Sequence, residues 1–421
     1  MRGIGYKRER RSGIHAARDE RRVRARRHER PIDAIGIEAE FVVRLDGRQV
    51  RPEEVFGSPR HIVRQSMMHR TGRSYHLPTG DAMYFDTGVI ELATPLIEIA
   101  PGCAARAGRS LWESIGFVRQ ELDAWEQRHG RGEVQLVGFS THYNVSFHAP
   151  ASGADERRSV EKLALLLTYL LPAPVMLLAA NRRSTGIGVR PRVNRVEVTA
   201  DFTPDAALMI ATATVIVGIV RAVMTWPNYE LSALAGRRGL PLFDGFGPVP
   251  HSSRKGWVAR ASSYRQNPFM CDVNRPLWRT RGGPLLSLRQ IAERTTRYFR
   301  SPIQRLADPL TFRLIGAVMS GRTPSLLELQ ERPPAYESVG RLCTWDDLFS
   351  DDALPRSRYE RVLARAIHGD RLQLDRDDWY VPTGMQGWSH VVFRRERDRT
   401  RHVFSLDYLS QHLGHWAPAD R

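Results

Sequence analysis

The stretch IGIEAEF, residues 35–41, decides how this sequence folds, and it contains two charged side chains whose surroundings need an explanation. Every second residue is apolar: Ile35, Ile37, Ala39 and Phe41. This alternation predicts a strand with one buried face, and Gly36, Glu38 and Glu40 fall on the other face. Two glutamates one strand step apart repel each other unless water or a cation lies between them. The surroundings of these two glutamates are therefore the main question that the sequence raises.

Beyond this stretch, the composition predicts a folded globular protein. The chain has 421 residues, of which 42% are hydrophobic and 26% are charged, which suits a large domain with a smaller one. The cysteines Cys103, Cys271 and Cys343 are far apart, and no C-x-x-C pair occurs. This spacing argues against a disulfide framework and against a thiolate metal site, and it favours a reducing cytoplasm.

Basic residues concentrate at the N-terminus. The formal net charge is +17, and residues 1–30 hold twelve Lys or Arg against four Asp or Glu, so +8 of that charge lies there. The stretch has almost no apolar residues to bury, so we predict that residues 1–31 form a basic extension, either disordered or a solvated helix. Binding of an acidic partner or of nucleic acid is one interpretation. A solvated extension without a partner is an equally good one.

Two apolar stretches are long enough to raise the question of a membrane span. Residues 163–180 contain two prolines, and residues 206–220 are shorter than the ~20 residues that cross a bilayer. Both therefore predict buried helices of a large core. No apolar segment follows the N-terminal charges, which argues against a signal peptide. We expect a cytoplasmic protein with no membrane partner.

The pattern of elements predicts an α+β fold with a mainly antiparallel sheet, because strands and helices follow no regular βαβ order. The predicted strands are 33–45, 83–94, 134–148 and 193–199. The predicted helices are 104–129, 159–171, 204–225, 285–300 and 303–319. Residues 236–284 are rich in Gly, Pro and Ser, which indicates loops, and residues 388–409 predict a hairpin.

Four of the predicted strands carry ionisable side chains among apolar neighbours. They are Glu38 with Glu40, Asp86 with Glu91, His142, and Arg195 with Glu197, and the amide of Asn144 shares the face of His142. One acid on a strand is usually solvated, but antiparallel neighbours would stack these residues into one patch. A buried patch of acids with one histidine needs cations, and its oxygen ligands suit Mg²⁺ or Mn²⁺. The sequence therefore predicts a divalent-metal site.

The same motifs resemble those of the glutamine-synthetase-like carboxylate–amine ligases, which include glutamate–cysteine ligases and the Pup ligase and Pup deamidase pair. GIEAEF resembles their G-x-E-x-E first strand, and MYFDTGVIELATPLIE resembles the Pup enzymes' segment in which an Asp precedes an acid-bearing stretch. FSTHYNVSF is similar to their H-x-N strand, and RVEVTADFTPDAAL to their Arg-x-His or Arg-x-Glu strand. LLAANRRSTGIGVR is similar to a segment of bacterial glutamate–cysteine ligases. These motifs keep the family's order and lie within residues 33–210.

The resemblance implies a role for each matched residue. The implied ligands of Mg²⁺ or Mn²⁺ ions that bridge ATP phosphates are Glu38, Glu40, Glu91, His142 and Glu197. Arg190 and Arg195 would contact phosphate or a substrate carboxylate, where a planar guanidinium fits, and Asn144 would assist them. The resemblance also implies a catalytic role for Arg195. Asp86 matches the Pup enzymes' aspartate, which acts there as base or nucleophile.

Two positions depart from the Pup enzymes. Residues 87–90 are Thr, Gly, Val and Ile where those enzymes have histidine and proline, and Glu197 stands where they have histidine. The second half of the chain matches no motif of the family. The resemblance therefore covers the metal and nucleotide core, and it leaves the substrate open.

The reaction that the resemblance implies is ATP-dependent amide formation. A carboxylate takes the γ-phosphoryl group of ATP, and an amine attacks the resulting acyl phosphate after a base such as Asp86 deprotonates it. The implied partners are a carboxylate-bearing small molecule or protein tail and an amine. The same scaffold could instead hydrolyse an amide or isopeptide bond, as a deamidase does. A third interpretation is a non-catalytic nucleic-acid-binding or adaptor protein.

The resemblance also implies an architecture. Residues 32–340 would form a glutamine-synthetase-like domain, with helices on one face of a curved sheet, and residues 341–421 a small C-terminal domain. Asp86 lies five residues before Glu91, and an odd spacing places two residues on opposite faces of a regular strand. We therefore predict an irregularity at Thr87–Gly88 that brings Asp86 to the metal face.

Overall fold

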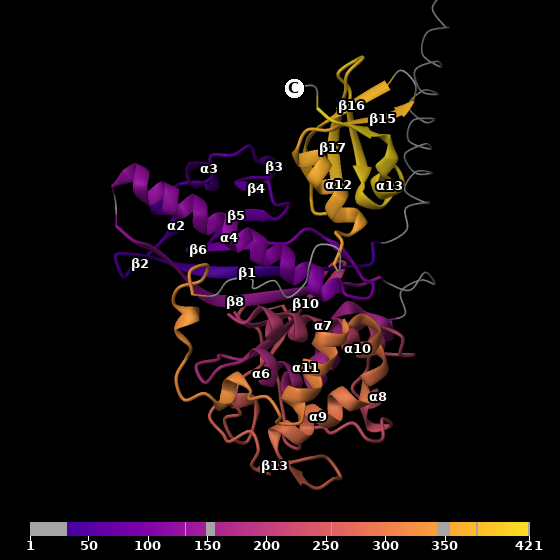
Figure 1. Cartoon of the computed structure of the whole chain (residues 1–421). Coiled ribbons are helices and arrows are strands. Elements are labelled where there is room, and N and C mark those ends of the chain that lie inside the picture. The colour runs from indigo at the N-terminus through magenta and orange to yellow at the C-terminus, as the bar shows by residue number, and fades with distance from the viewer. Residues whose placement is uncertain are drawn as a thin grey trace, which may run out of the picture.

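A large sheet, a layer of helices and a small C-terminal sheet make up the protein (Figure 1). The computed structural model describes residues 32–130, 132–148, 156–253, 255–342, 354–375 and 378–419. The predicted basic extension, residues 1–31, lies outside the described residues. All strand pairs within the described ranges are antiparallel. The predicted α+β fold with a mainly antiparallel sheet is confirmed.

The large sheet has the described strands in the order β11-β12-β9-β10-β8-β1-β6-β5-β4-β3, and β2 and β7 pair with β1. Their bounds are β1 Ala34–Leu45, β2 Arg48–Val50, β3 Met68–Thr71, β4 Ser74–His76, β5 Ala82–Asp86, β6 Val89–Ala93, β7 Ile97–Glu98, β8 Val134–Ser146, β9 Ile187–Arg192, β10 Arg195–Asp201, β11 Val249–Pro250 and β12 Trp257–Ala259. Strand β1, which contains the IGIEAEF stretch, lies in the middle of this sheet. Ile35, Ile37, Ala39 and Phe41 are fully buried in the core, as the alternation predicted.

The predicted strand 83–94 is a two-stranded hairpin. Strand β5 ends at Asp86, and β6 begins at Val89. Between them Thr87 and Gly88 have φ angles of 49° and 93°. Positive φ at both central residues is typical of the type I′ turn, whose twist matches that of the flanking strands. The irregularity predicted at Thr87–Gly88 is confirmed, as a turn rather than a bulge.

The turn places Asp86 and Glu91 on the same face of the sheet. Asp86 lies opposite Val89, and Tyr84 lies opposite Glu91. Residues opposite each other share a face, and so do residues two apart on one strand. Asp86 is therefore on the face that carries the glutamates, although it is exposed at the tip of the hairpin.

The helices pack against the apolar face of the sheet (Figure 1). Their bounds are α2 Pro52–Val55, α3 Pro59–Ile62, α4 Cys103–His129, α5 Val160–Leu170, α6 Pro172–Ala179, α7 Ala206–Met224, α8 Ser232–Ala235, α9 Leu288–Tyr298, α10 Arg300–Leu306 and α11 Pro309–Met319. Helix α4 runs across β1, and α5 packs on β9. Helices α9, α10 and α11 form an outer layer on α6 and α7. Pro172, the predicted stop of a helix, begins α6, because the first turn of a helix does not need its N–H.

Among the described residues, α7 is long and apolar enough to cross a membrane by length and composition, and so is the pair α5 and α6, which is bent by 63°. The most apolar window of α7 is 78% buried inside the protein. Helices α5 and α6 are likewise buried over most of their length. The prediction that both stretches are core helices is confirmed.

The predicted loop region 236–284 is mostly irregular but well packed. Its rings form a cluster, with centroids 4.8–5.5 Å apart for several pairs. The cluster consists of Phe243, Phe246, Tyr264 and Trp278. Strand β13, Trp278–Arg279, pairs with β14, Leu285–Leu286. Ser287 then caps α9, so the predicted helix begins three residues later than expected.

A segment that we name the strap, residues 331–342, returns from the helical layer to the sheet. Arg332 donates a hydrogen bond to the carbonyl oxygen of Gly138 at 2.5 Å. Glu337 bridges Arg44, at 2.9 Å, and Arg332, at 3.3 Å. The strap therefore lies along the ends of β1 and β8.

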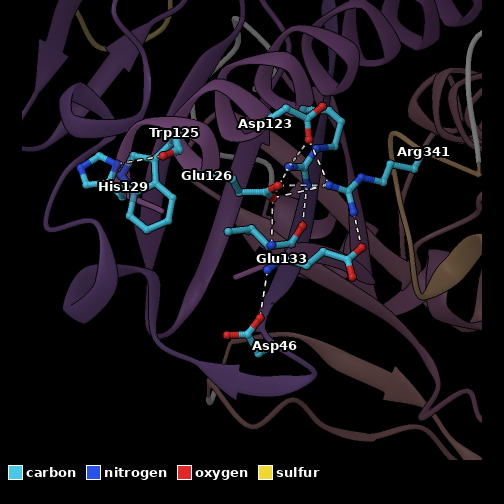
Figure 2. Close-up of polar contacts among 9 residues, drawn as sticks. Asp46, Asp123, Trp125, Glu126, His129, Glu133 and Arg341 are labelled. Atoms are coloured by element: carbon cyan, nitrogen blue, oxygen red, sulfur yellow. Dashed lines mark hydrogen bonds and ion pairs between the residues drawn. The ribbon is translucent and has the colours of Figure 1, made fainter. Parts of the chain in front are cut away.

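Figure 2 shows how Arg341 fastens the end of the strap. Its guanidinium lies 3.0 Å from Asp123 and 3.4 Å from Glu126 on α4, and it also contacts Glu133. Arg119 joins the same network at 2.8 Å from Glu126. Partly exposed ion pairs each contribute ~0–1 kcal/mol, so the network fixes the position of the strap more than it stabilises the fold.

The small C-terminal sheet has the order β18-β17-β16-β15-β19. Its elements are α12 Arg358–Ile367, β15 Arg371–Asp375, β16 Asp378–Gln386, β17 His390–Arg395, β18 Arg401–Ser405, α13 Leu406–Gln411 and β19 Trp416–Ala417. It has its own hydrophobic core and docks on β3 through β16. The predicted hairpin 388–409 is correct up to Ser405. Ser405 then caps α13 by accepting a hydrogen bond from Tyr408 N at 3.2 Å.

Candidate active site

The strand register brings three glutamates and a histidine together. Glu38 lies opposite His142 on β8, and Glu40 lies opposite Glu91 on β6. We name these four residues the acid cluster. One potential ligand atom from each of Glu38, Glu91 and His142 lies within 4.8 Å of the others. The predicted convergence of these three residues on one site is therefore present in the structure.

His142 lies between the two glutamates of β1. Its Nδ1 is 3.5 Å from Glu38 Oε2, and its Nε2 is 3.6 Å from Glu40 Oε1. The Ser140 hydroxyl donates a hydrogen bond to Glu40. Burial opposes the charge of each group. Even so, the pKa of Glu38 lies below its usual value and that of His142 above it, because they face each other as opposite charges.

The pKa of Glu91 shifts in the opposite direction to that of Glu38, although His142 is also nearby. Burial and the nearby charge of Glu38 raise the pKa of Glu91 to about 8. The Tyr84 hydroxyl donates a hydrogen bond to Glu91 at 2.5 Å. Burial and the surrounding carboxylates also raise the pKa of Tyr84 above its usual value. The cluster is therefore a place where negative charge is costly until a cation neutralises it.

This donor set fits a hard divalent cation. Glu38, Glu91 and His142 offer two carboxylates and one imidazole at a spacing that one ion could bridge. Glu40 and Tyr84 supply further oxygens at its edge. Oxygen-rich sets with few nitrogens suit Mg²⁺ or Mn²⁺ better than softer metals.

Glu197 lies outside the group of three potential ligands that share one site, whereas the resemblance implies that it binds metal together with His142. It is only 1% exposed and is surrounded by guanidinium groups. Arg192 binds it at 2.9 and 3.2 Å, Arg190 is in direct contact, and Arg195 lies 4.0 Å away. A buried carboxylate paired in this way is already neutralised and has little need of a metal.

The three predicted contacts for phosphate or carboxylate lie around this glutamate. Arg195 donates a hydrogen bond to Asn144 Oδ1 at 2.7 Å. Arg190 lies opposite Glu197 on the neighbouring strand. Because Glu197 holds the arginines close together, they form a positive surface beside the negative acid cluster.

Asp86 lies apart from the cluster. It is exposed, and the Thr87 hydroxyl donates a hydrogen bond to its Oδ1 at 2.9 Å. It follows Tyr84 by two residues on the same strand face. The structure therefore puts Asp86 at the rim of the site, with its carboxylate open to solvent.

Two cavities open beside the acid cluster. The first, the inter-domain cavity, has a volume of about 780 Å³ and lies between the large sheet and the C-terminal sheet. Its lining includes Glu38, Thr94, Asn144, Arg195, Trp388 and His390. The second, the strap cavity, has a volume of about 530 Å³. Its lining includes Glu40, Phe139, His142, Arg183, Asp201 and Arg332.

Several residues of the site were not predicted from the sequence. Tyr84 could have been found from the Thr-Gly pair, because a two-residue turn there sets Tyr84 opposite Glu91. Arg192 could have been found from a hairpin at 193–194, which sets it opposite Arg195 and so diagonally across from Glu197. Trp388 gave no such signal, because nothing in a sequence shows that a distant turn docks beside the first strand.

Known proteins are similar to this chain in structure and not in sequence. No protein-family model matches the chain, and no curated protein matches its sequence. A structure of the complex between the prokaryotic ubiquitin-like protein Pup and its ligase PafA is similar at 12% identity with a TM-score of 0.46, over 91% of this chain and 92% of that one. A structure of the Pup ligase PafA in complex with ADP is similar at 11% identity with a TM-score of 0.40, over 82% of this chain and 90% of that one.

Proposed function

We propose that this chain is an ATP- and Mg²⁺-dependent carboxylate–amine ligase that forms an amide or isopeptide bond through an acyl phosphate. One observation carries the proposal: the acid cluster is shared by two cavities. Glu38 lines the inter-domain cavity, while Glu40 and His142 line the strap cavity. This arrangement suits a transfer between two bound substrates, because it would let the reacting groups meet at the acid cluster.

The inter-domain cavity suits the nucleotide. Trp388 offers a flat apolar surface for a base, and Arg195 and Asn144 offer hydrogen-bond donors for phosphate oxygens. Glu38 belongs both to the lining of this cavity and to the acid cluster. The terminal phosphate would therefore approach the cluster while the base remains between the two sheets.

The strap cavity suits the second substrate. The carboxylate that accepts the phosphoryl group would enter from this side, and Arg190 beside Glu197 would orient it.

Glu38, Glu91 and His142 would hold Mg²⁺, which supplies neutralisation of the phosphate charge and alignment of donor and acceptor. Asp86, at the solvent-exposed rim, is available to take a proton from the incoming amine.

The test is Mg²⁺-dependent ATP binding by calorimetry, followed by ADP release against pools of amino acids and peptides. Glu38→Gln should abolish the Mg²⁺-dependent part of binding, because it removes a charge from the cluster. Glu54→Gln is the matched control, since Glu54 is 70% exposed on α2. ATP binding with amide cleavage and no ADP release would favour the hydrolase. Absence of ATP binding would favour a non-catalytic protein.

A further inference from the structure

The strap cavity has one unusual apolar wall. Phe139 on β8 is 57% exposed and lines this cavity. The register between β1 and β8 shifts there, because Glu40 pairs with Ser140 whereas Phe41 pairs with Gly138. Phe139 is thus the extra residue of a β-bulge. Bulges redirect side chains, and here the bulge turns a phenylalanine to the open face of the sheet.

The neighbouring residues hold the bulge in place. A side chain at Gly138 would collide with the ring of Phe202, so only glycine allows this close approach. Phe202 N donates a hydrogen bond to the carbonyl oxygen of Phe139 at 3.3 Å, and Arg332 donates one to that of Gly138. An exposed phenylalanine forgoes part of the free energy that burial of its ring would supply. A ligand that covers Phe139 would recover part of this free energy.

Charged groups of both signs lie around the same wall. Asp201 accepts hydrogen bonds from Asn181 N at 3.2 Å and from Asn181 Nδ2 at 3.1 Å, and Asn181 Oδ1 accepts one from Arg183 N at 2.8 Å. This chain of contacts fixes the loop that carries Arg183. Within the described residues the Arg183 guanidinium forms no ion pair, so it is free to bind a carboxylate. Glu40 supplies a carboxylate that can accept from an ammonium group.

We infer that the strap cavity binds a free α-amino acid with an apolar side chain, and that Phe139 determines this specificity. The inference rests on the proposed function, in which the amino acid is one of the two substrates. Arg183 binds its carboxylate, Glu40 its ammonium group, and Phe139 its side chain. A cavity of about 530 Å³ is within the range of small-molecule sites.

The experiment is calorimetric titration of the full chain, with and without Mg²⁺-ADP. The probes are L-phenylalanine, L-alanine, 2-phenylethylamine and 3-phenylpropionate. We expect L-phenylalanine to bind about tenfold more tightly than L-alanine, and each probe that lacks one charged group to bind more weakly than L-phenylalanine. Phe139→Ala should remove the preference over L-alanine, and Phe139→Leu should retain part of it. Leu285→Ala is the matched control, because Leu285 is 53% exposed and lies outside the cavity.

The outcomes separate this inference from the proposed function. Binding of Mg²⁺-ADP without binding of either amino acid overturns the inference alone. Retention of the full preference by Phe139→Ala also overturns it. Binding of amino acids with the expected preference but without any nucleotide binding overturns the proposed function and leaves the amino-acid site in place.

Discussion

The guanidinium of Arg70 lies over the indole ring of Trp388, with its central carbon 3.9 Å from the ring centroid. Arg70 belongs to β3 of the large sheet, and Trp388 lies in the turn between β16 and β17 of the C-terminal sheet. Burial lowers the pKa of Arg70, while the charges of Glu38 and Glu91 act in the opposite direction. The contact is a cation–π interaction worth about 0.5–2 kcal/mol. It joins the two sheets beside the inter-domain cavity and close to the acid cluster.

Replacing Trp388 should weaken nucleotide binding. Trp388→Ala removes both the flat wall of the inter-domain cavity and the support of Arg70, so we expect at least about tenfold lower affinity for Mg²⁺-ATP. Trp388→Phe should retain most of the affinity. Trp379→Ala is the control, because Trp379 lies on the same sheet outside the cavity lining. Equal affinities for Trp388→Ala and the wild-type protein, measured by calorimetry, would place the nucleotide elsewhere.

The Tyr84 hydroxyl should strengthen the metal site. It hydrogen-bonds Glu91 and favours the charged form of that carboxylate. Tyr84→Phe should therefore lower Mn²⁺ affinity by about tenfold at neutral pH, as loss of a supporting contact at metal sites commonly does. Glu91→Gln should lower it further. Titration followed by electron paramagnetic resonance gives both values, and unchanged Mn²⁺ affinity in Glu91→Gln would exclude Glu91 as a ligand.

Asp86 should matter for turnover and not for binding. Asp86→Asn keeps the shape of the hairpin tip but removes the base, so Mg²⁺-ATP binding should be unchanged while ADP release with the correct substrate pair is lost. The comparison requires binding and steady-state rates from the same preparation. Near-normal turnover in Asp86→Asn would show that the amine is deprotonated by another group or by water.

A buried carboxyl outside the site should make stability depend on pH. Burial raises the pKa of Asp81 well above 3.8, although hydroxyl groups of Ser110 and Ser114 hydrogen-bond to it. The protonated carboxyl is therefore favoured in the folded state. Its contribution to the free energy of unfolding is fully present below pH 3.8, the pKa of the unfolded chain, and it is lost as the pH rises toward the raised pKa of the folded state.

Asp81→Asn should remove this dependence. The free energy of unfolding of the wild-type protein, relative to Asp81→Asn, should fall by at least about 1 kcal/mol between about pH 4 and about pH 8. Urea unfolding across this range provides the measurement. Parallel curves for the two proteins would mean that Asp81 keeps its ordinary pKa in the folded state.

Local patterns predicted the parts of the site that lie on single strands. Alternation alone placed Glu38 and Glu40 on one face of β1 and His142 on the matching face of β8. The hairpin at Thr87–Gly88 was predicted only as an irregularity, because the residues on both sides of it favour strands. The pairing of Glu197 with Arg192 was missed, since the partner of a charge depends on cross-strand register. The cavities depend on contacts between distant segments, which a periodic pattern does not encode.

The strap also has a consequence for the order in which the molecule is made. Strand β1 and its acids are among the first described residues to leave the ribosome, whereas Arg332, which completes the strap cavity, follows almost three hundred residues later. Trp388, a wall of the inter-domain cavity, is later still. A nascent chain can therefore assemble the central strands with their acids before either cavity is complete. Neither cavity is therefore complete until its late segment, the strap or the turn that carries Trp388, has been translated.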